Sequence, residues 1–264
     1  MPQPDQPRIS LVIPALNEAE NIAPLVGEIA AALEAGPSYE IVFVDDGSDD
    51  GTAEAVKALM DNPNTAAAGR VRLLRHGRRA GKSAGLLTAA EAARGTLLVT
   101  MDADRQNDPS DVPALVAAFD ASGGLGKVGV VAGQRRRRRD TLLKRVSSRT
   151  ANAVRKSLLK DETRDTGCGL KLIPRDVFLR LPQFEGMHRF LPALAARLGY
   201  SIALVTVNDR LRVAGISKYG LWNRLWVGIG DMLATWWLIR RHRLPGEVQE
   251  IAAAPKPPGS LPEA

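Results

Sequence analysis

The sequence has little cysteine and no long apolar run, and each lack excludes something. Cys168 is its one cysteine in 264 residues, so no disulfide can form within the chain. No stretch of 18 or more apolar residues occurs, so no segment predicts an ordinary membrane-spanning helix. The first apolar run, 9–13, is too short for the core of an export signal. We therefore expect a cytoplasmic protein.

The composition that is present is ordinary for a folded enzyme or binding protein. Hydrophobic residues make up 45% and charged residues 25% of the chain, which excludes disorder as the main state. The formal net charge is +7. A basic balance indicates an anionic partner, and nucleic acid, anionic lipid and phosphorylated substrates all qualify.

Strand-like and helical patterns alternate along the first half of the chain. We predict strands over 9–14, 40–45, 71–75, 96–101 and 128–132, and helices over 17–33, 52–60, 83–94 and 109–119. In the second half we predict a helix over 141–159 and a strand over 200–207. The alternation favours an α/β fold whose parallel sheet is covered by helices on both faces. Ligands of such folds bind beyond the carboxyl ends of the strands.

Paired carboxylates follow two of these strands at the expected ligand edge. Asp45 and Asp46 follow the second strand, and Asp102 and Asp104 follow the fourth. Such pairs repel each other unless a cation or hydrogen-bond donors lie between them. An Asp-x-Asp turn can hold a hard divalent ion, which would neutralise a leaving diphosphate. Aspartates also form turns and helix caps. We favour that simpler role for Asp108 and Asp111.

These turns belong to an ordered set of motifs that resembles family 2 glycosyltransferases. The set comprises PALNEAENI at 14–22, VDDGS at 44–48 and DADRQ at 102–106. The resemblance runs over about 9–243 and is greatest to polyprenyl-phosphate glycosyltransferases of the dolichol-phosphate mannose synthase type. It implies a GT-A fold, a Rossmann-like three-layer αβα arrangement with a mostly parallel central sheet. It also implies an inverting transfer of a hexose from a GDP- or UDP-sugar to a polyprenyl phosphate.

The resemblance also implies roles for single residues. The nucleotide-sugar would be bound by Pro14, Glu18, Asp45, Asp46, Lys82, Asp102 and Asp104. Mg or Mn would be held by Asp102, Asp104 and Gln106. Arg105 departs from the motif, which normally has an apolar or small residue at that position.

Five consecutive arginines, 135–139, precede the predicted helix of the second half. Such a run can be solvated charge alone. Nucleic-acid binding is a second alternative, but the segment has no aromatic residue for stacking, and we expect no nucleic-acid partner. Arginine forks that bind phosphate are a third. The resemblance favours the third and implies that the acceptor phosphate is held by Arg135, Arg145, Ser147 and Lys218.

The segment RDTGCGLK, 164–171, resembles the acceptor element of the subgroup, with Cys168 and Lys171 as departures from serine and arginine. Asp165 stands where family members that transfer to a hydroxyl have a general base. A phosphate oxygen is already ionised and needs positioning more than deprotonation. The implied catalytic residues are Asp165, Arg135, Arg145, Arg212 and Lys218. Transfer to a sugar hydroxyl of a glycan or glycolipid, with Asp165 as base, stays open as an alternative.

Residues 77–83, GRRAGKS, nearly form a phosphate loop, but the spacing is one residue short. We therefore rank a nucleotide-hydrolysing enzyme low.

The four tryptophans gather near the C-terminus. Helical spacing places on one face Trp222, Trp226, Ile229, Leu233 and either Trp236 or Trp237. The tryptophans and the arginines that follow suit a helix lying in a membrane interface, and core or dimer packing is the alternative. We predict a catalytic domain over 1–212, an interface segment over 213–250 and a disordered tail over 251–264. The protein would be peripheral on the cytosolic face of the membrane, with a second copy or a membrane protein as an open further partner.

Overall fold

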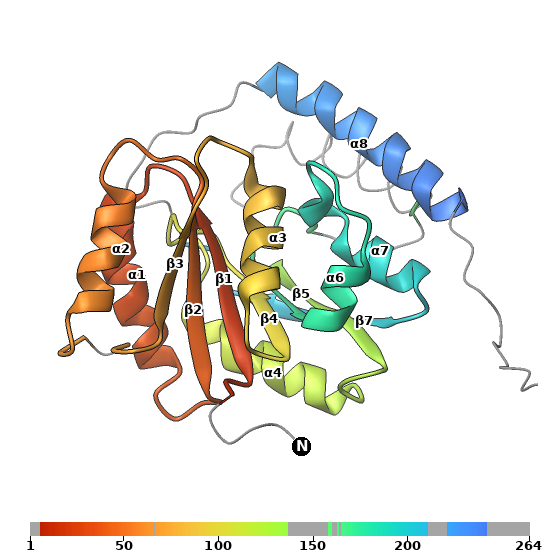
Figure 1. The fold of residues 1–264 in the computed structure, drawn as a ribbon. Coiled ribbons are helices and arrows are strands. Elements are labelled where there is room, and N and C mark those ends of the chain that lie inside the picture. Colours follow the sequence, from red (N-terminus) through yellow and green to blue (C-terminus); the bar gives the residue numbers. More distant parts are fainter. Residues whose placement is uncertain are drawn as a thin grey trace, which may run out of the picture.

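A computed structural model describes residues 6–65, 67–136, 158–159, 163, 165–210 and 221–241, and for 221–227 the backbone alone. Its centre is a sheet in the order β3-β2-β1-β4-β6-β5-β7 (Figure 1). The strands are β1 Ile9–Ala15, β2 Tyr39–Asp45, β3 Val71–Arg75, β4 Leu97–Thr100, β5 Val128–Arg135, β6 Lys171–Pro174 and β7 Ser201–Val207. The predicted α/β architecture is confirmed.

The sheet is mostly parallel, with one exception. β1 pairs in parallel with β2 and β4, β2 with β3, and β5 with β7. β6 runs antiparallel to both of its neighbours. The sequence does not indicate β6, because its four residues begin with a buried lysine and end with a proline, which usually marks a strand edge.

Helices cover both faces of the sheet (Figure 1). They are α1 Ala19–Ala32, α2 Thr52–Asp61, α3 Lys82–Ala92, α4 Val112–Ala121, α6 Arg175–Arg180, α7 Leu191–Arg197 and α8 Leu221–Arg241, with 3₁₀ turns η1 Pro109–Asp111 and η2 Met187–Arg189. The strand period of two sends alternate residues to opposite layers. In β1, Leu11 and Ile13 pack with α1, α2 and α4, whereas Val12 packs with α3, α6 and α7.

Two helix boundaries differ from expectation for local reasons. α1 begins at Ala19 and not at Asn17, because Asn17 has φ +53° and its side-chain Nδ2 donates to Asp49 at 2.6 Å. The helix predicted over 109–119 divides into η1 and α4. Asp108 caps η1 by accepting from the Ser110 amide at 3.0 Å, as expected. Most of the helix predicted over 141–159 lies outside the described residues.

Helix α8 lies across the upper side of Figure 1, the side at which the parallel strands end. Its inner face, with Met232, Trp236 and Ile239, packs on the core layer of α7. Its outer face exposes Ile229, Leu233 and Trp237. Core packing is thus confirmed for Trp236, whereas Trp237 is exposed, and contact of that outer face with a membrane stays a prediction. The Trp222 and Trp226 side chains lie outside the described residues, and no helix in the described part is long and apolar enough to cross a membrane.

Candidate functional site

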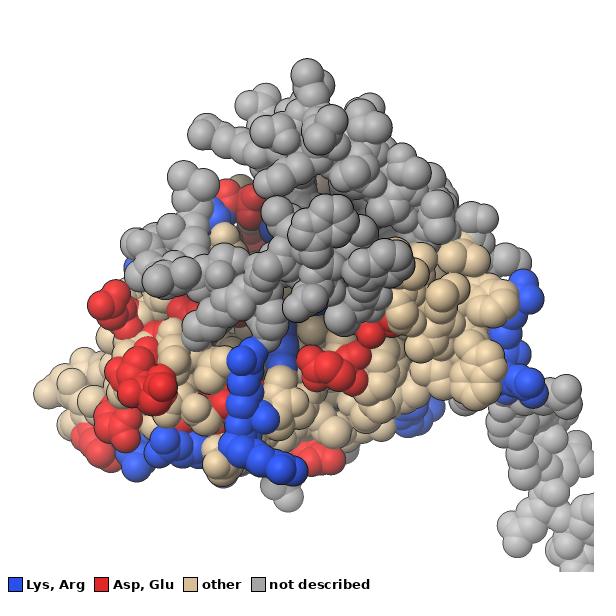
Figure 2. Space-filling view, turned by 90° about the horizontal axis from the view of Figure 1, so that it is seen from above, with Lys and Arg blue, Asp and Glu red and all other residues tan. Residues whose placement is uncertain are grey.

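The predicted site residues gather where β1, β2 and β4 end side by side. Register places Ala15 of β1 opposite Asp45 of β2, and Val12 opposite Thr100 of β4. The turns after these strands therefore meet at one edge of the sheet. Figure 2 looks down on that edge and shows basic and acidic side chains close together on its described part.

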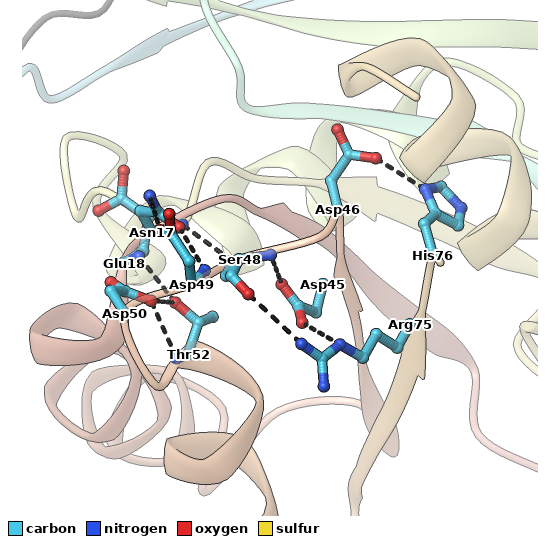
Figure 3. A network of polar contacts seen from close by, with 10 residues as sticks. All are labelled: Asn17, Glu18, Asp45, Asp46, Ser48, Asp49, Asp50, Thr52, Arg75 and His76. Carbon is cyan, nitrogen blue, oxygen red and sulfur yellow. Dashed lines mark hydrogen bonds and ion pairs between the residues drawn. The ribbon is translucent and has the colours of Figure 1, made fainter. Parts of the chain in front are cut away.

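Asp46 binds the loop that follows β3 (Figure 3). Its carboxylate accepts hydrogen bonds from the backbone amides of Ala80 and Gly81, both at 2.8 Å, and lies 2.7 Å from Nδ1 of His76. The 77–83 loop thus directs these amides at a carboxylate of the chain itself, which is not the arrangement of a phosphate loop. The sequence motif found Asp46 but gave no sign of His76 as its partner.

Asp45 is buried under the same turn (Figure 3). One carboxylate oxygen accepts the Ser48 amide at 2.9 Å, and the other lies 3.0 Å from Nε of Arg75. This arrangement shapes the 45–52 turn. Contact of Asp45 with a nucleotide stays a prediction.

Glu18 and Pro14 join β1 to the neighbouring elements. The Glu18 amide donates to the Thr52 hydroxyl at 2.9 Å (Figure 3). Its carboxylate accepts from the Asn21 side chain at 2.6 Å. Pro14 packs so closely on α3 that a Cβ at Gly85 would lie 2.9 Å from it. Both residues therefore lie at the predicted edge. Their contact with a nucleotide stays a prediction.

The second acidic turn already contains an ion pair. The ammonium of Lys82, the first residue of α3, pairs with Oδ1 of Asp102. Burial favours the neutral acid, but the charge and hydrogen bond of Lys82 outweigh it and lower the pKa of Asp102. Asp104 is buried and accepts the Gln106 amide at 3.1 Å.

The oxygen donors of this turn fit a hard divalent ion. Asp102, Asp104 and Gln106 offer carboxylate and amide oxygens on one loop, and Asp102 attracts a positive charge in the structure itself. No group of three or more His, Cys, Asp or Glu side chains in the described residues could hold a metal alone. A bound ion would need diphosphate and water oxygens to complete its shell, as Mg²⁺ commonly does.

Arg105 now has a physical explanation. With φ +60° it directs its guanidinium to Glu28 of α1, where Nε lies 3.1 Å from Oε1. Arg210 binds the other oxygen of Glu28 at 2.6 Å and also reaches Asp108 at 2.6 Å. The sequence gave no signal for Glu28 or Arg210. Together these groups, which we call the Glu28 bridge, join the acidic turn to α1 and to the end of β7.

Asp111 does not cap α4 through its side chain. It accepts the Asn208 amide at 2.8 Å and so holds the same segment after β7. The capping role expected for it is therefore wrong.

A basic cavity of about 430 Å³ opens beside Asp102. Four cations line it, Lys82, Arg135, Lys171 and Arg189, and the imidazole of His188 lies on the same wall. Lys171 is 3% exposed, and its Nζ contacts the carbonyl oxygens of Cys168 and Thr166. Burial lowers the pKa of Lys171 to about 8. Burial and the nearby lysines also hold the pKa of His188 well below its usual value, so this imidazole is neutral.

Asp165 is engaged by Arg135 through both of its oxygens. Nε donates to Oδ2 at 2.5 Å and Nη2 to Oδ1 at 3.0 Å, and the hydrogen bonds to Asp165 raise the pKa of Arg135 further. Sequence placed both residues at the acceptor side, and the structure brings them together at the cavity. The other predicted phosphate-binding residues, Arg145, Ser147, Arg212 and Lys218, lie outside the described residues.

Gly169 allows the loop 165–170 to contact the acidic turn. A Cβ at this position would lie 2.5 Å from Oδ2 of Asp102 and 2.7 Å from Oδ1 of Asn107, so only glycine fits without displacement. The carbonyl of Gly169 accepts the Thr100 hydroxyl at 2.6 Å.

The sequence pattern of glycosyl transferase family 2 matches residues 10–181, about two thirds of the chain. The chain therefore belongs to this family of glycosyltransferases. A dodecaprenyl-phosphate galacturonate synthase of Rhizobium johnstonii is 32% identical over 90% of this chain and 69% of its own. An undecaprenyl-phosphate 4-deoxy-4-formamido-L-arabinose transferase of Shewanella sediminis is 34% identical over 81% of this chain, which spans 62% of that relative.

Solved structures confirm the GT-A fold. Glucosyl-3-phosphoglycerate synthase of Mycobacterium tuberculosis, crystallised with uridine diphosphate, superposes with a TM-score of 0.64. The match covers 88% of this chain and 80% of that one at 24% identity. A complex of the same enzyme with Mn²⁺ and UDP-glucose gives a TM-score of 0.62 at 22% identity.

Proposed function

We propose that the protein transfers a sugar from a nucleotide-sugar to a polyprenyl phosphate. The observation that carries the proposal is the basic cavity, whose wall includes Lys82, the ion-pair partner of Asp102. A phosphate acceptor is ionised at neutral pH, so it needs cations that bind and orient it. The two relatives described above are named for sugar transfer to dodecaprenyl and undecaprenyl phosphate, which supports this class of acceptor.

The donor site comprises the turns after β1, β2 and β4. The donor in this proposal is a GDP- or UDP-hexose, bound by Glu18, Asp46 and the acidic turn. Asp102, Asp104 and Gln106 would hold Mg or Mn, which neutralises the charge of the departing nucleoside diphosphate. Lys82 adds a second positive charge at Asp102. Lys82 and a bound ion would together offset the charge of the leaving diphosphate. The acceptor phosphate in the cavity would attack the anomeric carbon from the opposite side, and the bond to the nucleoside diphosphate would break.

The geometry of Asp165 favours a positioning role over that of a general base. Both carboxylate oxygens accept hydrogen bonds from Arg135, and this fork fixes the guanidinium at the cavity wall. A base would need a carboxylate oxygen directed at a hydroxyl proton. Transfer to a phosphate therefore fits the arrangement better than transfer to a sugar hydroxyl.

The outer face of α8 supports attachment at a membrane surface. Leu233 and Trp237 are 51% and 54% exposed, and Arg240 and Arg241 follow at the end of the helix. An apolar stripe with tryptophan and terminal arginines is typical of helices that lie in the interface plane. A polyprenyl phosphate presents its phosphate at that surface.

A transfer assay tests the proposal directly. Purified protein is incubated with Mn²⁺, a short-chain polyprenyl phosphate and a panel of GDP- and UDP-sugars. The sugars of the panel include uronic acids and pentoses. The mass of the lipid product is measured by mass spectrometry. We expect one donor to give a polyprenyl-phosphate sugar. Nucleotide release without a lipid product would exclude the phosphate acceptor and return Asp165 to the role of base.

The variant Asp104→Ala tests the donor half of the proposal. We expect it to abolish turnover while the folded state, followed by circular dichroism, persists. Asp176→Ala, which removes an exposed carboxylate on α6, is the matched control. Near-normal rates in Asp104→Ala would contradict the metal and diphosphate assignment.

A further inference from the structure

Helix α8 carries a single carboxylate, Asp231, and directs it toward the body of the protein. The Asp231 side chain is 20% exposed, whereas Ile229 and Leu233 on the neighbouring positions belong to the exposed face. Its Oδ2 lies 3.7 Å from Nη1 of Arg189. Burial raises the pKa of Asp231, and the charge of Arg189 opposes that shift. A largely buried carboxylate lowers stability unless a partner compensates its charge.

The partner of Asp231 belongs to the basic cavity. Arg189 ends the η2 turn and lines the cavity together with His188. His188 in turn lies 3.0 Å from the Ser83 hydroxyl at the start of α3, next to Lys82. The contact therefore connects α8 to the wall where Lys82 and Asp102 meet.

The fit between α8 and this turn is close. A Cβ at Gly186, where φ is +85°, would lie 2.6 Å from Oδ2 of Asp231. Thr235, fully buried one turn later, donates its hydroxyl to the Asp231 carbonyl at 2.7 Å. The Thr235 bond lies within α8, whereas the carboxylate itself packs against Gly186 and faces the Arg189 guanidinium.

We propose that Asp231 is a positioning residue that holds Arg189 toward the acceptor phosphate, so that α8 forms part of the acceptor site. The inference rests on the proposed function. The Arg189 side chain is 41% exposed and would sample many conformations without a fixed partner. Nη1 of its guanidinium faces Asp231, and a guanidinium has five N–H donors, more than one carboxylate can use, so the same fork can also bind a phosphate in the cavity. The charge of Glu185 also acts on Arg189. The same helix presents its apolar stripe on the opposite side, where the lipid surface would lie.

The test compares substrate KM values in single and double variants. Asp231→Asn keeps the shape and removes the charge. We expect it to raise the KM for polyprenyl phosphate about tenfold, leaving the KM for the nucleotide-sugar and co-sedimentation with anionic vesicles unchanged. Arg189→Gln should have the same effect, and the double variant should be no worse than Arg189→Gln alone. Asp231→Glu should restore part of the acceptor affinity.

Asp176→Asn is the matched control, because it removes an Asp–Arg pair on the exposed surface of α6, away from the cavity. An Asp231→Asn variant with the wild-type acceptor KM would overturn the inference. So would a variant in which both KM values rise together and the melting temperature falls, since that describes a structural role. Absence of lipid product from the wild-type protein would instead overturn the proposed function, and the inference with it.

Discussion

Replacing Gly169 by alanine tests whether close contact between the loop 165–170 and the acidic turn is required for activity. The new Cβ would lie 2.5 Å from Oδ2 of Asp102, and ordinary contact begins at 3.4 Å. The carboxylate must therefore move by about 0.9 Å, and a displacement of about 1 Å in a catalytic site lowers the rate about 100-fold. Overpacking of this kind also lowers the free energy of unfolding by about 1–3 kcal/mol.

The assay for Gly169→Ala is steady-state transfer with saturating acceptor, together with urea denaturation. Gly27→Ala is the control, because a Cβ on that α1 glycine meets nothing within 4 Å. We expect Gly27→Ala to keep normal kinetics and Gly169→Ala to lose kcat while most molecules remain folded in buffer. A kcat for Gly169→Ala within threefold of the wild-type value would refute the placement of Asp102 at the reacting groups.

Three further predictions follow from single contacts. Glu28→Gln removes the charge that pairs with two arginines in the Glu28 bridge. The free energy of unfolding in urea should therefore fall by about 1 kcal/mol. An unchanged urea midpoint would contradict a stabilising role of the bridge. Lys171 has a pKa of about 8, so its ammonium loses the proton as pH rises from 7 to 9, and the KM for polyprenyl phosphate should rise over that range. Lys171→Arg stays charged and should give a flatter profile; an equal rise would exclude Lys171 as the titrating group. Leu233→Glu should weaken co-sedimentation with anionic vesicles while leaving the melting temperature unchanged, and full retention of vesicle binding would argue against the exposed face of α8 as the membrane contact.

The strands were predictable because burial leaves a local mark on the sequence. β2 is buried along its whole length and reads as a continuous apolar run between turn residues. β6 is as fully buried but was missed, since Lys171 and Pro174 occupy its ends and its pairing with β4 depends on residues about 75 positions away. The local pattern of apolar residues therefore predicts β2 but not β6.

The candidate site likewise has residues that the sequence predicts and contacts that it does not. Asp102 and Asp104 could be placed from sequence because a parallel sheet brings its ligands to the ends of its strands. The Glu28 bridge could not, because Glu28 is separated from Arg105 by 77 positions and from Arg210 by 182. Nor could the fork between Asp165 and Arg135 be predicted from local sequence, and this contact supports the positioning role that we propose for Asp165 over the alternative of a general base.

The cations of the cavity share a pattern that bears on how a phosphate would bind. Three of them are paired with carboxylates from three different elements: Lys82 with Asp102, Arg135 with Asp165, and Arg189 with Asp231. Their positions are therefore fixed before any ligand arrives, and preorganised charges stabilise an anion without further reorganisation. Lys171 differs, because it is buried and its ammonium contacts the carbonyl oxygens of Thr166 and Cys168. It is the cation whose charge a phosphate would neutralise most directly, since desolvation has already been imposed on it by the fold.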